Sequence, residues 1–275
     1  MNILEIHGLS KSFGDNKVID EISFNVPENC VFGFIGSNGA GKTTTMKMIL
    51  GLLNPDKGEI YVNGDRVHFG ATKTNRMIGY LPDIPEYYGY MRPRDYLRLC
   101  ADIADIDKKK ATVRIEELLR LVGLDHADYR INGFSRGMKQ RLGLAQALIG
   151  EPKLLICDEP TSALDPVGRK EILDILKEIK GNTTVIFSTH ILSDIERICD
   201  RVAILDKGKI AFESDVADLK VRNKTKAITI EFNEEVETDR VLQVLKENSF
   251  IPVKYETAES VIEKLFLEVT QCDNL

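Results

Sequence analysis

The chain has 275 residues, of which 43% are hydrophobic and 29% charged, so it is long enough for one large globular domain with an appendage or for two domains. Its 37 basic and 43 acidic side chains give a formal net charge of −6, which does not favour binding to a nucleic-acid backbone, although a local basic patch is compatible with it. The five cysteines are odd in number and lack Cys-x-x-Cys spacing, which indicates free thiols in a reducing compartment rather than a disulfide or zinc framework.

No stretch of the sequence approaches the roughly 20 apolar residues that a membrane-spanning helix needs. The first seven residues also lack the basic and apolar regions of a signal peptide. We therefore expect a soluble, cytoplasmic protein, for which any work at a membrane requires a partner.

Short apolar runs alternate with amphipathic helical patterns in most of the chain. The predicted elements, in chain order, are a strand at Val31–Ile35, a helix at Lys42–Leu50, strands at Leu154–Cys157 and Thr184–Phe187, and between these two strands a helix that Asp165 and Pro166 begin and Gly181 ends. Because strands alternate with helices, we predict an α/β fold with a mainly parallel sheet that is covered on both faces.

Helical patterns dominate between about residues 88 and 150, where the sequence predicts no strand. The candidate helices are Arg94–Ala104, Ala111–Leu124 and Arg136–Ile149. We predict that this segment forms a helical subdomain inserted into the α/β core.

The pattern changes again after residue 214. Ala227–Phe232 alternates like a strand, whereas Thr238–Lys246 and Ser260–Val269 have helical periodicity. We predict a core domain at 1–214 and a small α+β appendage at 215–275. Regulation, dimer stabilisation and simple packing all stay open as roles for the appendage.

A phosphate-binding loop is the most specific local motif. It has the form G-x-x-x-x-G-K-[ST] and comprises Gly36, Ser37, Asn38, Gly39, Ala40, Gly41, Lys42 and Thr43, between a predicted strand and a predicted helix. The glycines let the backbone wrap closely round a phosphate, while the helix N-terminus and Lys42 supply positive charge. The Thr43 hydroxyl is placed to bind Mg²⁺, and Thr44 could add a hydrogen bond to phosphate. A glycine-rich turn that binds nothing would not need the lysine and the threonine.

Two acidic residues, Asp158 and Glu159, follow the buried strand at Leu154–Cys157. A binding site at the carboxyl ends of parallel strands requires this change from apolar to charged residues. Because successive side chains point in different directions, Asp158 would hold Mg²⁺ and Glu159 would polarise the attacking water as a general base. Alone, such a pair is more often a helix cap or a solvated loop, but the upstream phosphate loop favours the catalytic interpretation.

The phosphate loop and the acidic pair indicate only a P-loop ATPase, and further motifs indicate which family of P-loop ATPases the chain resembles. Phe134–Arg141 resembles the LSGGQ signature of ABC ATPases, and Ser162–Asp165 is similar to the D-loop of that family. Ser188-Thr189-His190 is similar to the family's switch-histidine motif, and Phe13 stands where the family stacks an aromatic ring on adenine. The order and spacing match from about residue 3 to residue 212.

The resemblance implies a P-loop NTPase core of the RecA type with an N-terminal antiparallel β part, and ATP with Mg²⁺ as cofactors. It implies that Ser135 and Gly137 face the γ-phosphate bound on a second copy or a paralogue, so that two ATPase domains close head to tail. Ser135 is also suited to a plain helix N-cap, and both roles are compatible. His190 would contact the γ-phosphate and act in catalysis with Glu159 and Lys42. A separate membrane-spanning transporter subunit would hold the chain at the inner face of the cell membrane.

The sequence departs from the family at Asp83, where a glutamine is usual. One hypothesis makes Asp83 a working variant that still binds Mg²⁺, and the other makes it a site of weakened coupling to the partner. The following aromatic segment, Pro85–Met91, would dock the partner or pack on the helical subdomain. These variant motifs resemble ATPases of antibiotic, peptide or lipid exporters more than those of importers.

Two other classes compete with the transporter interpretation. A non-transport ABC ATPase that acts on ribosomes or nucleic acid usually carries two ATPase domains or a long coiled-coil insertion, and this sequence has neither. A small-molecule kinase or GTPase would share the phosphate loop but would not account for the signature and histidine motifs. We therefore predict the ATP-hydrolysing subunit of an ABC transporter, with export favoured.

Overall fold

The computed structural model describes residues 1–70, 72–162, 164–222 and 238–248. The chain divides into two units, Met1–Val216 and Ala217–Leu275. Helix α7 (Val216–Arg222) spans that division, and α8 (Thr238–Glu247) confirms the helix predicted at Thr238–Lys246. The strand expected at Ala227–Phe232 and the helix expected at Ser260–Val269 lie outside the described residues. No helix among the described residues is long and apolar enough to cross a membrane.

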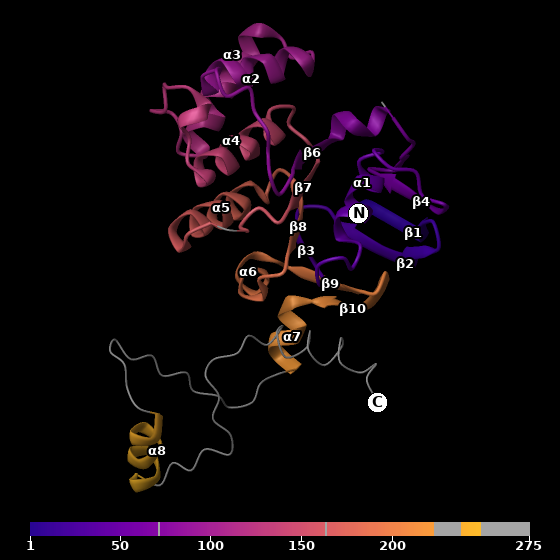
Figure 1. The fold of residues 1–275 in the computed structure, drawn as a ribbon, viewed down its shortest axis with the longest axis vertical. Helices are drawn as coiled ribbons and strands as arrows, with labels where there is room; N and C mark the ends of the chain where they lie inside the picture. Colours follow the sequence, from indigo (N-terminus) through magenta and orange to yellow (C-terminus); the bar gives the residue numbers. More distant parts are fainter. Residues whose placement is uncertain (71, 163, 223–237, 249–275) are drawn as a thin grey trace. The chain divides into compact units, whose positions relative to one another are not determined.

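A mostly parallel sheet forms the centre of the first unit (Figure 1). Within the described residues its strand order is β10-β9-β3-β8-β7-β6. The strands are β3 (Val31–Ile35), β6 (Ile78–Leu81), β7 (Leu154–Asp158), β8 (Thr184–Thr189), β9 (Arg201–Asp206) and β10 (Lys209–Asp215). Within this sheet, the β9–β10 pair is the only antiparallel one among the described strands, and the other pairs are parallel. β3, β7 and β8 are buried at every position, because both faces of the sheet are covered.

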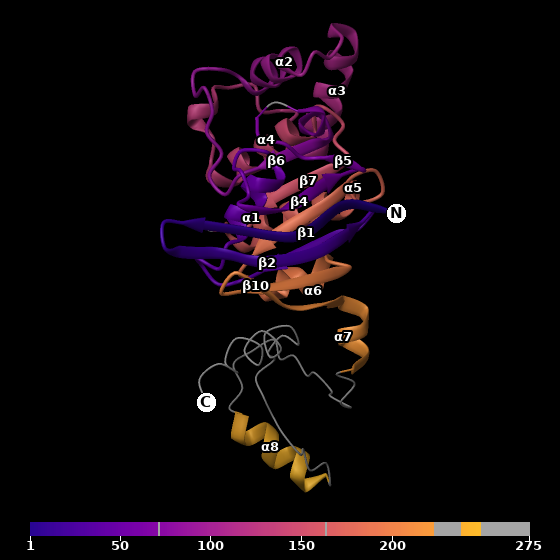
Figure 2. The same ribbon diagram turned by 90° about the vertical axis from the view of Figure 1, so that its right-hand side faces the viewer.

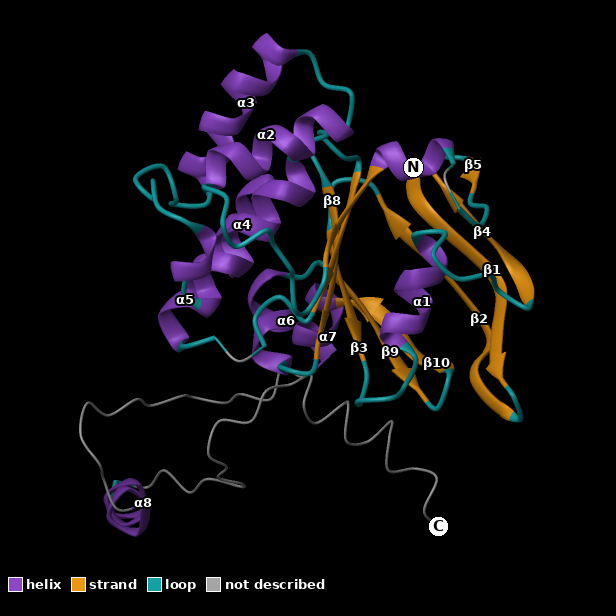
Figure 3. Ribbon diagram, turned by 45° about the horizontal axis from the view of Figure 1, so that its top comes forward, coloured by secondary structure: helices purple, strands orange, loops and turns teal. Residues whose placement is uncertain are grey.

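Helices and a second sheet cover the two faces (Figure 3). On one face lie α4 (Arg136–Leu148), α5 (Pro166–Ile179) and α6 (Leu192–Ile198), and on the other lie α1 (Lys42–Ile49) and the second sheet. This arrangement confirms the predicted α/β class with a RecA-type, mainly parallel sheet.

The second sheet is the predicted antiparallel N-terminal part, seen face-on in Figure 2. It has the order β2-β1-β4-β5 in the described residues, with β1 at Asn2–Phe13, β2 at Asn16–Pro27, β4 at Lys57–Val62 and β5 at Asp65–Arg66. Phe24 of this sheet stacks on Phe32 and Phe34 of β3, with ring centroids 5.6 and 5.5 Å apart. A shared apolar core therefore fixes the phosphate-loop strand β3 to the antiparallel sheet.

The helical segment consists of α2 (Pro93–Ile103), α3 (Lys108–Leu121) and the signature helix α4, with short 3₁₀ turns η1 (Lys73–Met77) before β6 and η2 (Ile131–Gly133) before α4. Helix α3 begins three residues before the predicted Ala111. The reason is Asp107, whose carboxylate accepts hydrogen bonds from the N–H groups of Lys109 and Lys110 and so caps the helix earlier.

The carboxyl ends of the central parallel strands determine where the functional side chains meet. β3, β7 and β8 lie next to one another and run parallel, so the segments that follow them emerge at one edge of the sheet. In this register Asp158 pairs with Ser188, and Ile35 pairs with Thr189. The phosphate loop, the two acids and the histidine motif are therefore brought to the same edge.

Candidate active site

The glycine-rich loop between β3 and α1 has two positions whose backbone conformation favours glycine. Its residues are Gly36, Ser37, Asn38, Gly39, Ala40 and Gly41. Gly39 and Gly41 have φ angles of +85° and +111°. A Cβ on Gly41 would lie 2.4 Å from Ile19 Cδ1 and 3.0 Å from Val18 O, so the loop presses against the antiparallel sheet at this point. The contact with β2 therefore leaves no room for a side chain at the residue that precedes α1.

Lys42 is buried inside this loop, with 6% of the residue exposed. Its ammonium donates hydrogen bonds to the carbonyl oxygens of Gly36 and Ser37, at 2.6 and 3.3 Å. It also lies 3.5 Å from Glu159 Oε1. A buried ammonium that faces a glycine-rich loop fits the binding of an anion.

The N-terminus of α1 supports the same ligand. No side chain in the described part of the chain caps this helix at Gly41. The first N–H groups of a helix have no acceptor within it, so those of Lys42, Thr43 and Thr44 are free to bind an anion. The residues present therefore fit a phosphate.

Asp158 joins the phosphate loop to strand β8. Its two carboxylate oxygens accept hydrogen bonds from Thr43 Oγ1 at 2.8 Å and from Ser188 Oγ at 2.7 Å. The residue is only 4% exposed, so both hydroxyls stabilise a charge that is shielded from water. Burial, followed by the charges of Asp158 and Asp83, raises the pKa of Tyr80 to about 12.

The oxygen donors of Thr43 and Asp158 fit a divalent cation such as Mg²⁺, which prefers oxygen ligands. The described residues contain no cluster of three or more histidine, cysteine or acidic side chains that could hold a metal alone. Mg²⁺ commonly takes only one or two protein carboxylates and completes its shell with water and substrate phosphates. The donor set therefore suits a cation that arrives with a nucleotide.

Glu159 is held in a strained backbone conformation, with a φ of +49°. Its N–H donates to both the carbonyl and the hydroxyl oxygens of Ser188, each at 3.1 Å. Its Oε2 lies 2.8 Å from His190 Nδ1, whereas its buried Oε1 has no hydrogen-bond donor among the described residues. One carboxylate oxygen is thus oriented by the histidine, and the other faces the Lys42 ammonium without accepting a hydrogen bond among the described residues.

Ser188 belongs to the predicted switch-histidine motif, but the sequence analysis gave it no role of its own. Its hydroxyl donates to Asp158 and accepts from the Glu159 N–H, so one side chain orients both acids. The histidine motif drew attention to His190, two positions further on. The parallel register of β7 and β8, which pairs Asp158 with Ser188, was the signal that could have identified it.

Other predicted site residues make contacts with other parts of the described chain. Ser135 caps α4 by accepting a hydrogen bond from Met138 N–H at 3.2 Å, and Gly137 lies in the first turn of that helix. Among the described residues, no hydrogen bond or ion pair joins Ser135 or Gly137 to Lys42. Phe13 ends β1 with its ring half exposed and Lys11 Nζ 5.6 Å from the ring centroid.

Asp83 follows β6 and has three contacts of its own. Ser162 Oγ donates to Asp83 Oδ1 at 2.5 Å, and Arg136 Nη2 lies 3.8 Å from the same oxygen. The Asp83 carbonyl accepts from Gln140 Nε2 at 3.1 Å. The residue predicted as a third Mg²⁺ ligand therefore contacts the signature helix and the loop after Glu159.

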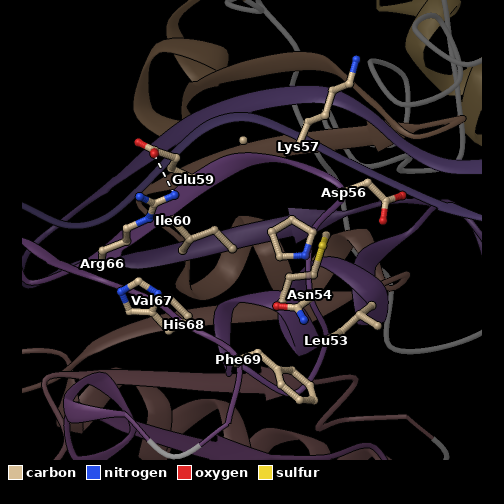
Figure 4. Close-up of a pocket in the computed structure, with 14 residues that line it drawn as sticks. Leu53, Asn54, Asp56, Lys57, Glu59, Ile60, Arg66, Val67, His68 and Phe69 are labelled. Atoms are coloured by element: carbon tan, nitrogen blue, oxygen red, sulfur yellow. Dashed lines mark ion pairs between the residues drawn. The ribbon is translucent and has the colours of Figure 1, made fainter.

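A pocket of about 240 Å³ lies beside β4 and β5, outside this cluster (Figure 4). Leu53, Ile60 and Phe69 contribute apolar surface to it, and Arg66 forms an ion pair with Glu59 at its edge. None of the predicted nucleotide-site residues lines this pocket within the described part of the chain. It is therefore separate from the candidate active site.

The fold and the cluster define a class: a P-loop nucleoside-triphosphate hydrolase, with its glycine-rich loop, helix N-terminus and paired acids at one sheet edge. A family model described as ABC transporter matches residues 19–162. An uncharacterised ABC transporter ATP-binding protein, YxlF from Bacillus subtilis (strain 168), is 43% identical over 236 residues, which cover 86% of this chain and 78% of that protein.

Two further similarities agree with that match. The bacitracin transport ATP-binding protein BcrA from Bacillus licheniformis is 38% identical over 272 residues, covering 98% of this chain and 86% of that protein. A solved ATP-binding subunit of an ABC transporter superposes with a TM-score of 0.72 at 34% identity, covering 80% of this chain and 92% of that one. The chain belongs to the ABC transporter family, as a nucleotide-binding subunit that hydrolyses ATP.

The phosphate loop can be tested with Gly41→Ala. The added methyl group would be strained at φ +111° and would collide with Ile19, so we expect the affinity for a fluorescent ATP analogue to fall about tenfold or more. Gly181→Ala is the matched control, because its Cβ would meet no described atom within 4 Å. Equal affinities of the two variants in equilibrium titrations would contradict the role of the loop.

Proposed function

We propose that this chain powers a separate membrane-spanning transporter subunit by closing head to tail with a second copy of itself around ATP. The observation that carries the proposal is that, within the described part of one chain, no hydrogen bond or ion pair joins Ser135 or Gly137 to the Lys42 cluster. Both stand at the N-terminus of α4, where a hydroxyl, backbone N–H groups and the helix dipole favour an anion. In this proposal, the anion that they bind is the γ-phosphate held by the other copy.

The charges of the cluster suit ATP together with Mg²⁺. The buried ammonium of Lys42 lies 3.5 Å from the Glu159 carboxylate, and the neighbouring Asp158 carboxylate is also buried. We propose that Lys42 and the N-terminus of α1 bind the phosphates, while Thr43 and Asp158 hold the cation. Mg²⁺, when bound, would neutralise the charge that develops on the phosphate oxygens.

Glu159 is our candidate general base. Its Oε1, which accepts no hydrogen bond among the described residues, would accept a proton from the attacking water. The oxygen of that water bonds to the γ-phosphorus as the bond to the β-phosphate oxygen breaks and ADP leaves. His190 would hold Oε2 and contact the γ-phosphate, so loss of that phosphate changes its surroundings. Ser188 would fix the positions of both acids, because its hydroxyl accepts from the Glu159 N–H and donates to the Asp158 carboxylate.

A docking surface for the membrane subunit is supported by the aromatic segment after Asp83. Tyr88 and Tyr90 are 56% and 70% exposed, and their ring centroids lie 6.0 Å apart. Tyr87 behaves differently, because its hydroxyl donates to Lys139 O at 2.5 Å and its ring packs edge-on against Tyr96. We propose that Tyr87 anchors the segment to the helical subdomain and that Tyr88 and Tyr90 contact the partner.

The direction of transport is proposed to be export. The similarity to a bacitracin transport ATP-binding protein and the variant signature around Ser135 support this direction. The chain would then work at the inner face of the cell membrane, held there by its partner. The alternative, action on ribosomes or nucleic acid, finds no support in the family match.

The role of Glu159 can be tested with Glu159→Gln. An amide cannot accept the proton from water, so we expect kcat for ATP to fall by roughly 10²–10⁴ while ATP binding persists. The variant should also accumulate as an ATP-bound dimer in size-exclusion chromatography. Glu178→Gln, on the exposed face of α5, is the control and should keep normal turnover. Near-normal turnover of Glu159→Gln would remove it from the base role.

The transporter role can be tested by purifying the tagged chain from mildly solubilised membranes of the organism that encodes it. We expect a polytopic membrane protein to copurify in stoichiometric amount with the wild-type chain. Tyr88→Ala combined with Tyr90→Ala should lose that protein and retain ATPase activity, since both side chains are exposed. Recovery of ribosomes or nucleic acid in its place would support the non-transport alternative.

A further inference from the structure

Asp83 is the point where three separate segments of the chain meet. It lies two residues after β6, its carboxylate contacts Ser162 and Arg136, and its carbonyl accepts a hydrogen bond from Gln140. Gln140 is only 1% exposed, so its contact to the Asp83 backbone is shielded from water. Asp83 thus links the β6 edge of the sheet to the first turns of α4 and to the loop after β7.

Ser162, in the loop after β7, connects Asp83 to Glu159, the proposed general base. Ser162 N–H donates to Glu159 O at 3.0 Å, while Ser162 Oγ donates to Asp83. The neighbouring Thr161 is itself fixed, because its hydroxyl donates to the buried carboxylate of Asp194 at 2.9 Å. The short turn that contains the strained Glu159 backbone is therefore held from two sides.

A carboxylate suits this position better than an amide. Asp83 Oδ1 accepts from the Ser162 hydroxyl and faces the Arg136 guanidinium at once, and both contacts favour a negative oxygen. An amide oxygen would retain the contact with Ser162 but would lose the ion pair with Arg136. These two contacts give a structural reason for aspartate at a position where the family resemblance implies glutamine.

We propose that Asp83 is a positioning residue that fastens the Glu159 turn and the start of α4 to β6. Its carboxylate acts through Ser162 and Arg136, and it does not need to touch the substrate. The proposal rests on Glu159 as the general base, and it requires that Asp83 affects turnover rather than ATP or Mg²⁺ affinity.

The test compares Asp83→Ala, Ser162→Ala and their double variant in steady-state ATP hydrolysis by the full chain. A hydrogen bond to a charged group is lost in each single variant, so we expect kcat to fall about tenfold. The KM for ATP and the half-saturating Mg²⁺ concentration should stay within about twofold of the wild type. The double variant should be no slower than the slower single variant, since both remove the same contact.

Asp83→Asn provides the conservative variant and should recover part of kcat, because it can still accept from Ser162. Asp102→Ala, an exposed acid of α2, is the control and should behave as the wild type. A raised Mg²⁺ requirement for Asp83→Ala, together with an unchanged kcat for Ser162→Ala, would overturn the proposal and assign Asp83 to the metal. If Glu159 is not the general base, a different result shows it: Glu159→Gln would then keep normal turnover.

Discussion

The carboxylate of Asp158 is the contact on which the rest of the site depends. Each of its oxygens accepts from a hydroxyl, one on α1 and one at the end of β8, so a single buried charge ties the phosphate loop to two strands. A buried carboxylate without such donors would be strongly destabilising. The requirement to satisfy this charge therefore fixes how closely α1, β7 and β8 approach one another.

Glu159, the residue after Asp158, combines a strained backbone with a charge that is largely shielded from water. Glu159 adopts a left-handed backbone conformation that Ser188 holds, and its side chain lies between the Lys42 ammonium and His190. Residues in sparsely populated conformations persist only when their surroundings over-determine them, and such strain clusters at active sites. Ser162 helps to hold the Glu159 backbone, because its N–H donates to the Glu159 carbonyl. Since the Ser162 hydroxyl donates to Asp83, our proposal lets Asp83 act on Glu159 without contacting the phosphate loop.

Much of this arrangement was predictable from local patterns. The strand at Val31–Ile35 and the helix that begins at Lys42 agree with the structure, because a buried apolar run and a glycine-rich loop are strong local signals. The start of α3 was predicted three residues late, since the cap at Asp107 precedes the apolar periodicity. The roles of Ser188 and Asp83 arise from contacts between segments 30 and 79 residues apart, which no local pattern encodes.

The central claim is that Ser135 of one copy completes the site that Lys42 builds in the other. Complementation measures this directly: purified Lys42→Ala and Ser135→Ala chains, each inactive alone, are mixed and assayed for ATP hydrolysis. Head-to-tail closure predicts that the mixture regains activity, because pairs that contain one chain of each kind have one intact site. A mixture that stays as inactive as its components would contradict the account, since Ser135 would then have to act within its own chain.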